Sequence, residues 1–328
     1  MKERIKGRKN YPTEEVDPEN FLDDKAISNL INNLKTIKFH QEDYYKLYNC
    51  VHCGECKTEK DRIILKQKFL ENGNILEGLE EMKNCFKNYR TPYPTKKMRI
   101  KRPSNIPKDS DTLFFMGCLS TIRIPKYTEH AINYLLDTRV DFTLLDEEIC
   151  CGWPWFASGS MDEFLIAREE NVEIFNKFKK VICLCPACYY LFNQLYKPLI
   201  KRDVKFDYIS TYLKPSKTKK SGNVGVQHLC QLMNRGSKGI EKEVDNILRK
   251  AGYDVKDIPH WCCGGGIGQM HRKEVIDKIA RLRMEDFNRE DLDIITTYCP
   301  GCWWILDRYS KKCKIKPKAV DIFQLLTS

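Results

Sequence analysis

Long hydrophobic runs are missing from this sequence. No uninterrupted apolar stretch approaches the roughly 18 residues that cross a bilayer, so a transmembrane segment is not expected. The charged residues 1–6 lead into no apolar segment of the kind found in a secretory leader, and we therefore expect a cytoplasmic protein. General disorder is excluded as well, because 42% of the residues are apolar and 11% are aromatic, which is enough to build packed cores.

Signatures of nucleotide binding are missing too. The glycine-rich run at 264–268 opens a predicted helix, but no Rossmann or Walker pattern accompanies it, so neither a flavin nor a nicotinamide site is expected. Such glycines more simply let the backbone pass close to another group. Residues 82–108 hold nine basic side chains and no acidic one, within a net charge of +11. Since aromatic residues are few there, nucleic acid is not expected to bind. We interpret the stretch as a basic linker, which could also dock an acidic electron-transfer protein such as a ferredoxin.

Cysteine, by contrast, is abundant, with 16 in the chain. Disulfide scaffolds are typically short and secreted, whereas this chain is long and expected in a reducing compartment, so its cysteines are expected to bind metal. All but two of them form three groups in the sequence: Cys50, Cys53, Cys56 and Cys85; then Cys118, Cys150, Cys151, Cys185 and Cys188; then Cys230, Cys262, Cys263, Cys299 and Cys302. Of the other two, Cys183 lies in an apolar strand and is expected to be a packed core thiol, and Cys313 is assigned no function.

The second and third groups are copies of each other. The single cysteine and the adjacent pair recur 112 positions later, and the Cys-x-x-Cys hooks recur 114 positions later. The hooks begin at Cys185 and Cys299, and both read Cys-Pro-small-Cys followed by two aromatic residues. Because equivalent cysteines keep nearly the same spacing over the whole repeat, the sequence indicates an internal duplication. The duplication divides the chain into a loose tail (1–20), a small helical domain (21–90), the basic linker (91–108), a first repeat (109–214), a second linker (215–222) and a second repeat (223–328).

Local patterns predict the elements of these parts. Apolar residues at 27, 30, 31 and 34 lie on one helical face behind Asp23 and Asp24, and those at 75, 79, 82 and 86 lie on another. In the repeats, helices such as 162–178 and one ending at Gly252 alternate with short strands at 112–116, 140–145, 181–184, 224–226 and 294–297. This alternation predicts an α/β fold with mostly parallel sheets. The repeat cysteines other than Cys183 fall in loops after the strands, where such sheets carry their functional groups.

The cysteine pattern favours a metal cluster over a single ion. Each repeat offers one Cys-x-x-Cys hook, one adjacent pair and one single cysteine. Structural zinc is commonly held by four ligands from two short hooks. Adjacent cysteines point apart in an extended chain and suit a ligand with several metal atoms, so five thiols per repeat favour an iron–sulfur cluster.

These residues carry a family resemblance. A single Cys, 31 intervening residues, Cys-Cys-Gly and then Cys-x-x-Cys resembles the cysteine-rich CCG domain. That domain occurs in the B- and D-type subunits of heterodisulfide reductases and in iron–sulfur subunits of glycerol-3-phosphate, lactate and glycolate oxidation. The resemblance covers residues 109–328 and occurs twice, with all five cysteines each time. It implies a noncubane [4Fe-4S] cluster in each repeat, held by Cys118, Cys150, Cys151, Cys185 and Cys188 in the first and by Cys230, Cys262, Cys263, Cys299 and Cys302 in the second.

The N-terminal motif Cys50-x-x-Cys53-Gly-x-Cys56 resembles half of a ferredoxin-type motif and implies one cubane [4Fe-4S] cluster. Lys60 stands where that motif has its fourth cysteine. The second motif of the relatives is reduced here to Cys85, which we expect to be the fourth ligand. Without it the cluster would have an open iron and would be labile.

Other residues are candidates for supporting roles. His228, His260 and His271 surround the cysteines of the second repeat and are candidate proton donors to a thiolate that leaves a disulfide, with a structural role as the alternative. All five tryptophans lie within four residues of a predicted ligand. They would form ordinary core, an apolar wall that keeps water from the clusters, or both.

The sequence thus predicts an iron–sulfur oxidoreductase, resembling heterodisulfide reductase, that reduces a disulfide or oxidises two thiols between its repeats. The cubane would relay electrons from a partner protein, either a ferredoxin or a flavoprotein subunit. The alternative is a non-catalytic electron-transfer subunit of a flavin dehydrogenase or a quinone-linked complex. A third hypothesis is a cluster-bearing binding or assembly protein. The complete cysteine sets favour catalysis, because a relay needs no vacant site between two unusual clusters.

Overall fold

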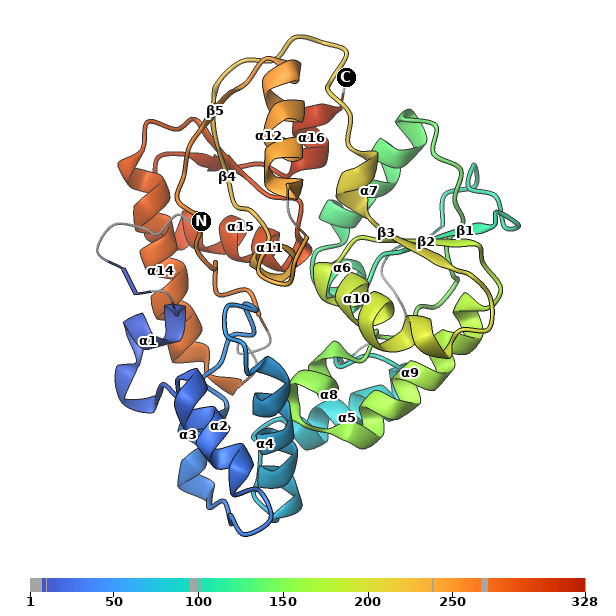
Figure 1. Cartoon of the computed structure of the whole chain (residues 1–328). Coiled ribbons are helices and arrows are strands. Elements are labelled where there is room, and N and C mark those ends of the chain that lie inside the picture. The colour runs from blue at the N-terminus through green and yellow to red at the C-terminus, as the bar shows by residue number, and fades with distance from the viewer. Residues whose placement is uncertain are drawn as a thin grey trace.

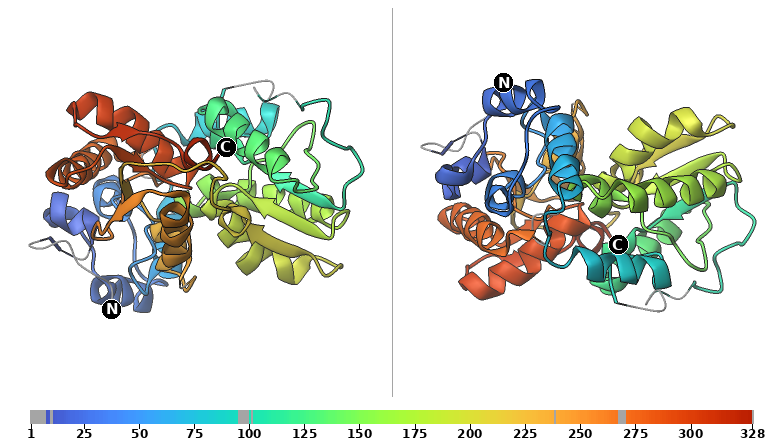
Figure 2. Two further views of the ribbon diagram at one scale, coloured as in Figure 1. Left: turned by 90° about the horizontal axis from the view of Figure 1, so that it is seen from above. Right: turned by 90° about the horizontal axis from the view of Figure 1, so that it is seen from below.

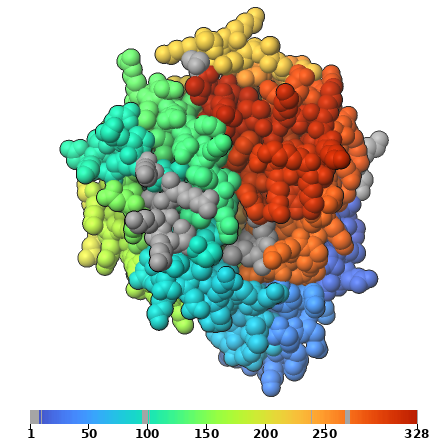
Figure 3. All heavy atoms as spheres, turned by 180° about the vertical axis from the view of Figure 1, so that it is seen from behind, coloured from blue at the N-terminus to red at the C-terminus, as the bar shows by residue number. Residues whose placement is uncertain are grey.

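Three parts make up the computed structural model, which describes residues 8–9, 11–94, 100, 102–237, 239–266 and 271–327 (Figure 1). The two repeats lie side by side, and the N-terminal helical part lies across one end of both, as the views from above and below also show (Figure 2). Helix α1 of that part contacts α14 of the second repeat, and α4 contacts α8 of the first. Seen from behind, the second repeat, in orange and red, lies directly against the first, in green (Figure 3).

The N-terminal part is all helical, as predicted. Its elements are α1 (Pro12–Val16), η1 (Pro18–Asn20), α2 (Asp24–Asn32), η2 (Gln41–Asp43), α3 (Tyr44–Leu47), α4 (Glu59–Glu71) and α5 (Leu79–Tyr89). Asp23 caps α2 by accepting a hydrogen bond from the Ala26 amide at 2.7 Å. Leu65 and Phe69 of α4 are buried against Ile27 of α2 and form the core of this part.

Two details of this part differ from the expectation. Residues 12–20 were expected to lie in a loose tail, but they form α1 and η1, and Arg272 fixes them by binding Asp17 at 2.8 Å. The sequence pattern could not show this, because the partner lies in the second repeat. Ile75 is 72% exposed and precedes α5, so the buried face of that helix begins at Leu79 instead.

The repeats consist of alternating strands and helices. The first contains β1 (Thr112–Phe115), α6 (Cys118–Ile122), α7 (Pro125–Asp137), α8 (Trp153–Ser158), α9 (Met161–Phe175), β2 (Lys180–Cys183), α10 (Pro186–Leu191), η3 (Phe192–Tyr196), η4 (Lys197–Leu199), β3 (Lys205–Tyr208) and η5 (Ile209–Tyr212). The second contains β4 (Asn223–Val226), α11 (Cys230–Met233), α12 (Ile240–Ala251), β5 (Asp254–Lys256), α14 (Lys273–Arg289), β6 (Ile294–Thr296), α15 (Pro300–Cys313), β7 (Lys318–Ala319) and α16 (Ile322–Leu326).

Each repeat has its own parallel sheet, and the two sheets share one strand order. The first runs β1-β2-β3 and the second β5-β4-β6-β7, so β1, β2 and β3 correspond to β4, β6 and β7. The strand expected at 140–145 contributes only the bridge between Leu113 and Thr143, at the place that β5 takes in the second repeat. The α/β fold with duplicated, parallel sheets is therefore confirmed. In the first repeat, a single β-bridge takes the place of the edge strand β5 of the second repeat.

The described parts of the basic linker are not loose. Arg102 donates a hydrogen bond to the Leu144 carbonyl and pairs with Asp146 at 3.1 Å, and Ile106 is buried. The linker therefore packs on the first repeat, although residues 95–99 and 101 lie outside the described residues. Within the described ranges, no helix has the length and apolar character needed to cross a membrane.

Candidate functional site

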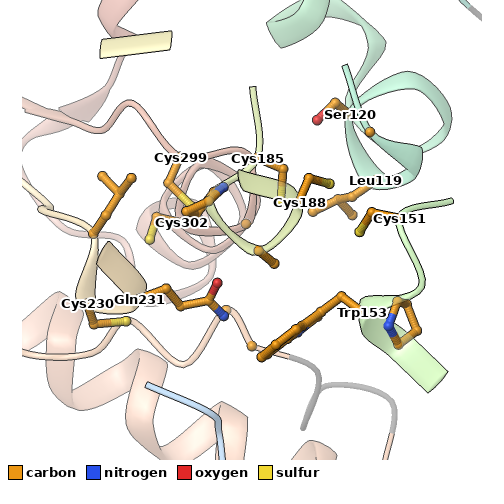
Figure 4. A pocket seen from close by; sticks show the side chains of 18 of the residues that line it. Leu119, Ser120, Cys151, Trp153, Cys185, Cys188, Cys230, Gln231, Cys299 and Cys302 are labelled. Carbon is orange, nitrogen blue, oxygen red and sulfur yellow. Dashed lines mark hydrogen bonds between the residues drawn. The ribbon is translucent and has the colours of Figure 1, made fainter. Parts of the chain in front are cut away.

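One pocket lies between the repeats, at the carboxyl ends of their strands. Cysteines from both repeats line it, and Figure 4 shows the two Cys-x-x-Cys hooks side by side in its middle. We call Cys118, Cys150, Cys151, Cys185 and Cys188 the first cysteine set, and Cys230, Cys262, Cys263, Cys299 and Cys302 the second. Cys150 is the one member that the pocket lining does not include, and it lies 3.4 Å from Cys118, Sγ to Sγ. The structure therefore brings together all ten repeat cysteines that the sequence singled out.

Backbone and buried polar groups position the first cysteine set. Gly117 has φ +87°, which turns the chain from β1 into the helix that begins at Cys118. The Glu148 carboxyl accepts hydrogen bonds from the amides of Met116 and Gly117, both at 2.7 Å. Asn171 of α9 donates to the Cys150 carbonyl at 3.1 Å. These bonds hold the loop after β1 and the cysteine pair against one another.

The second cysteine set has the same layout. The Sγ atoms of Cys230 and Cys262 are 3.8 Å apart, and those of Cys263 and Cys302 are 3.2 Å apart. Backbone amides also point at sulfur: Cys302 donates to Cys299 Sγ at 3.4 Å. Such amides at the start of α15 favour negative charge on the hook.

The glycine run after Cys263 serves close packing, as the sequence suggested. A Cβ added to Gly265 would lie 2.7 Å from the Gly301 carbonyl oxygen, and one added to Gly266 would lie 2.1 Å from that of Val51. Only glycine lets the loop approach both the hook of its own repeat and the N-terminal part. The loop thus brings the N-terminal cysteines next to the second cysteine set.

The thiols of each set perturb one another. Burial opposes ionisation of Cys151, but hydrogen bonds from Cys150 and Cys188 hold its pKa well below the usual value. In the second set, the hydrogen bond shared with Cys302 lowers the pKa of Cys263. Burial raises the pKa of Cys150 and Cys188 well above the usual range, and nearby thiols add to the rise. Only cations at the centre of each set would let all five thiols ionise together.

This donor set fits an iron–sulfur cluster. Thiolate is the soft ligand that such clusters use, and each repeat brings five buried or half-buried thiols together. Within the described ranges, no three His, Cys, Asp or Glu side chains are arranged to hold a single metal ion. Every cysteine of the chain is a free thiol, so no disulfide competes for these ligands.

The N-terminal cysteines, Cys50, Cys53 and Cys56, line a smaller pocket of their own. Burial, and after it the neighbouring Cys230 thiol, raises the pKa of Cys53 well above its usual value. The Cys53 carbonyl accepts a hydrogen bond from Asn234, on the turn after α11, at 2.9 Å. This site therefore lies beside the second cysteine set.

The structure does not bring Cys85 to these three residues. Cys85 lies on α5 and is absent from the residues that line their pocket. Burial and the charge of Glu81 on the same helix raise the pKa of its thiol, and no other cysteine contributes. The expected fourth ligand is thus not assembled by this fold. Cys183, in contrast, is fully buried in β2, as a core thiol should be.

None of the three candidate histidines lines the pocket. His228 faces away, with Nδ1 3.1 Å from the Tyr298 hydroxyl and Nε2 3.3 Å from Asp245. His271 is buried edge-on against Tyr48, and burial lowers its pKa to about 3. His260 lies in the loop before the second cysteine pair and also stays outside the lining. Their position does not support the role of proton donor that the sequence suggested.

Other residues, which the sequence analysis did not single out, provide the polar groups of the pocket. They are Tyr93, Ser120 and Gln231. Burial raises the pKa of Tyr93 well above its usual value, and the thiols of Cys118 and Cys150 add to the rise, so its hydroxyl remains a proton-bearing donor. No local signal marks Tyr93, because it enters the site from the linker. Trp153 is the one tryptophan that lines the pocket (Figure 4).

Comparisons with known proteins agree with this geometry. The family described as a cysteine-rich domain, CCG, matches residues 112–193 and 224–307, which together are half of the chain. An uncharacterized iron-sulfur protein of Methanocaldococcus jannaschii is 27% identical over 314 residues, covering 87% of this chain and 62% of the relative. Another, of Methanococcus maripaludis, is 28% identical over 292 residues, covering 82% and 58%. The chain thus spans about three fifths of the length of these curated relatives.

Two more distant similarities were found. The B-type subunit of fumarate reductase (CoM/CoB) from Methanothermobacter marburgensis is 25% identical over 223 residues, covering 65% of this chain and 45% of the relative. The crystal structure of a hypothetical protein from Helicobacter pylori matches with a TM-score of 0.58 at 12% identity, covering 92% of this chain and 66% of that one. At that identity the second similarity shows the fold alone.

Proposed function

The chain belongs to the CCG cysteine-rich domain family of iron–sulfur electron-transfer proteins, and from that premise we propose that it reduces a disulfide, or oxidises two thiols, in the pocket between its repeats. In the reducing direction, one disulfide takes up two electrons and two protons and leaves as two thiols. An electron-donor protein, either a ferredoxin or a flavoprotein subunit, supplies the electrons. The oxidising direction reverses this balance.

The observation that carries the proposal is the convergence of the two cysteine sets on one pocket, which nine of their ten members line. Burial, and also the Cys185 thiol from the other repeat, raises the pKa of Cys299, so the two hooks are close enough to influence each other. The first set would hold one noncubane [4Fe-4S] cluster and the second set another. Bound there, such clusters supply one-electron chemistry and iron sites that accept thiolates. Two one-electron sites match a two-electron substrate, in agreement with the five cysteines that each copy holds.

The remaining pocket residues have roles that follow from their chemistry. Trp153, Leu119 and Leu229 form apolar walls that keep water from a buried sulfur substrate. The Tyr93 hydroxyl and the Gln231 amide are the donors that could hold a departing thiolate. We propose Tyr93 in place of the three histidines, because it lines the pocket and they do not.

The N-terminal cysteines would hold a cubane [4Fe-4S] cluster with three protein ligands. Burial raises the pKa of Cys56 to about 11, and the charge and hydrogen bond of Arg62 oppose this rise by favouring the thiolate that iron requires. The Asn234–Cys53 hydrogen bond keeps this site next to the second cysteine set. Such a position suits an electron inlet for the pocket.

A second candidate is a non-catalytic electron-transfer subunit. Its support is that one relative is named as a subunit of a fumarate reductase and that the chain spans less than half of that relative. The two hypotheses differ in whether a thiol or disulfide binds directly at a cysteine set.

Anaerobic metal analysis and electron paramagnetic resonance (EPR) spectroscopy test the proposal. Three clusters correspond to about twelve irons per chain; zinc instead of iron, or four irons or fewer, would overturn the cluster assignment. A thiol substrate added to the oxidised protein should then produce a new paramagnetic signal, which a sulfur-33 label broadens. Cys151→Ser and Cys263→Ser should each abolish it, whereas the core variant Cys183→Ser should retain it. If no thiol in a broad panel changes the spectrum while a flavoprotein reduces the clusters, the electron-transfer subunit is the correct hypothesis.

A further inference from the structure

A buried arginine lies behind the second cysteine set. Arg283 of α14 is completely buried. Its Nε donates to Gln227 Oε1 at 2.7 Å, and its Nη1 donates to the Pro259 carbonyl at 3.0 Å. Burying a guanidinium is costly unless its charge is compensated or used. Nothing in the sequence pattern indicated this residue, because its position on α14 reads as one more charge on a long helix.

The hydrogen bonds of Arg283 place its charge beside the loop that carries the second cysteine pair. Pro259, whose carbonyl accepts a hydrogen bond from Arg283, lies three residues before Cys262. Gln227, which also accepts from Arg283, donates in turn to the Trp261 carbonyl at 3.0 Å. This buried positive charge therefore lies next to the second cysteine set, where it stabilises negative charge.

The first cysteine set has no such cation in the corresponding place. The 112-residue register that relates the cysteine pairs puts Asn171 where the second repeat has Arg283. Asn171 is equally buried, but it is a neutral amide that donates to the carbonyls of Cys150 and Ala167. Arg168, one turn earlier on α9, is only partly buried and lies 5.9 Å from the Phe164 ring. Solvent therefore screens its charge.

The counter-charge of Arg283 is itself shared. Asp286 lies 3.6 Å from Arg283, but Arg8 binds the same carboxylate at 2.9 Å, and Arg289 reaches it at 3.5 Å. Arg289 also pairs with Glu285 at 3.6 Å, but Arg8 and Arg283 share Asp286, so a positive excess remains near the second set. Arg235, which also lies near Cys230, is different because it is paired with Glu59.

We infer that Arg283 makes the two cysteine sites electrostatically unequal, so that the second site holds its cluster at a more positive reduction potential than the first. The inference rests on the proposed iron–sulfur sites and adds which of them is the more easily reduced. A nearby cation stabilises the added electron, and the low dielectric of a buried site strengthens the effect. The second site is also the one beside the N-terminal cysteines, which would make it the nearer electron acceptor.

The test is an EPR-monitored redox titration of the iron-loaded protein. Arg283→Met should shift the midpoint potential of one repeat cluster to a more negative value and leave the other unchanged. Arg283→Lys should restore most of the original value, because it keeps the charge. Arg281→Met, which removes an exposed arginine from the same helix, is the matched control and should shift neither. Cys151→Ser and Cys263→Ser assign each signal to its repeat.

A reciprocal variant separates charge from structure. Asp286→Asn removes the carboxylate and should shift the same cluster to a more positive potential, opposite in sign to Arg283→Met. If Arg283→Met loses iron from the second site, the Asp286→Asn shift still decides the matter. Unchanged potentials in iron-loaded variants, or equal shifts in both clusters, would overturn the inference. A protein that binds no iron would instead refute the proposed cluster sites. If the protein binds iron but does not reduce a disulfide, the proposed activity fails, and the two potentials can still be measured to test the inference.

Discussion

The side-chain amide of Asn234 donates a hydrogen bond to the Cys53 carbonyl at 2.9 Å. The next residue extends this junction, because the Arg235 guanidinium binds both the His52 carbonyl and the Glu59 carboxylate. The same guanidinium lies 4.5 Å from the ring centre of Tyr190, in the first repeat. All three parts of the chain therefore meet at one arginine, next to the N-terminal cysteines. This position fixes the N-terminal site relative to the pocket.

Breaking the Arg235–Glu59 pair should destabilise the protein. Burial opposes ionisation of Glu59, but the hydrogen bond from His52 and the charge of Arg235 lower its pKa to about 2. Arg235→Met leaves this carboxylate buried without its main counter-charge and should cost about 3–5 kcal/mol in the free energy of unfolding. Denaturant titration of iron-loaded protein measures it.

The double variant Arg235→Met/Glu59→Gln provides the control. It removes both charges and should recover about 1–3 kcal/mol relative to the sum of the single variants. Additive costs would show that the two side chains do not depend on each other, which would contradict the junction described above.

A methyl group at Gly266 should separate the N-terminal part from the second repeat. The added Cβ would lie 2.1 Å from the Val51 carbonyl oxygen, a distance that only backbone movement can relieve. Gly266→Ala should therefore lower stability by about 1–3 kcal/mol and increase amide exchange in residues 50–56. Gly73→Ala is the control: its φ of +81° strains an alanine, but nothing lies within 4 Å of the added Cβ, so this variant carries backbone strain without a clash. It should cost about 1 kcal/mol and leave that exchange unchanged.

The sequence predicted the duplication and the positions of the repeat cysteines, because both follow from local sequence patterns that recur along the chain. Each strand, each glycine turn and each cysteine of a repeat is specified by its own neighbours, so the spacing alone was sufficient to place all ten thiols in equivalent loops. The failures concern contacts between distant segments. Tyr93 reaches the pocket from the linker, and Arg283 of α14 binds the Pro259 carbonyl in the loop before Cys262. No local pattern encodes either contact.

Cys85 is the residue for which sequence spacing and fold disagree most directly. It was expected to complete the N-terminal cluster, but the structure places it on α5, outside the pocket of Cys50, Cys53 and Cys56. Cys85→Ser should therefore leave the EPR signal of the cubane unchanged. Cys53→Ser is the matched variant and should remove that signal while sparing both repeat clusters. A cubane signal lost in Cys85→Ser would show that the fold rearranges when iron is loaded.

Lys66 gives the fold a pH dependence of definite sign. It is 1% exposed on α4, with Nζ 2.8 Å from His52 Nε2 and 3.0 Å from the Ala157 carbonyl. Burial lowers its pKa from 10.5 to about 8. Between these two pH values the unfolded chain keeps a proton that the folded protein has released. The free energy of unfolding should therefore rise with pH across this window, by up to about 1.4 kcal/mol per pH unit.

Lys66→Met removes this contribution and isolates it. Urea titrations of iron-loaded wild type and variant at pH 8 and 10 should show that the wild type gains stability relative to Lys66→Met as the pH rises. Below pH 8 both states hold the proton, so the difference between the two proteins should be constant there. Lys60→Met removes an exposed lysine from the same helix and should follow the wild type throughout. Parallel curves for wild type and Lys66→Met would mean that the ammonium group keeps its proton, stabilised by the carbonyl and imidazole that it contacts.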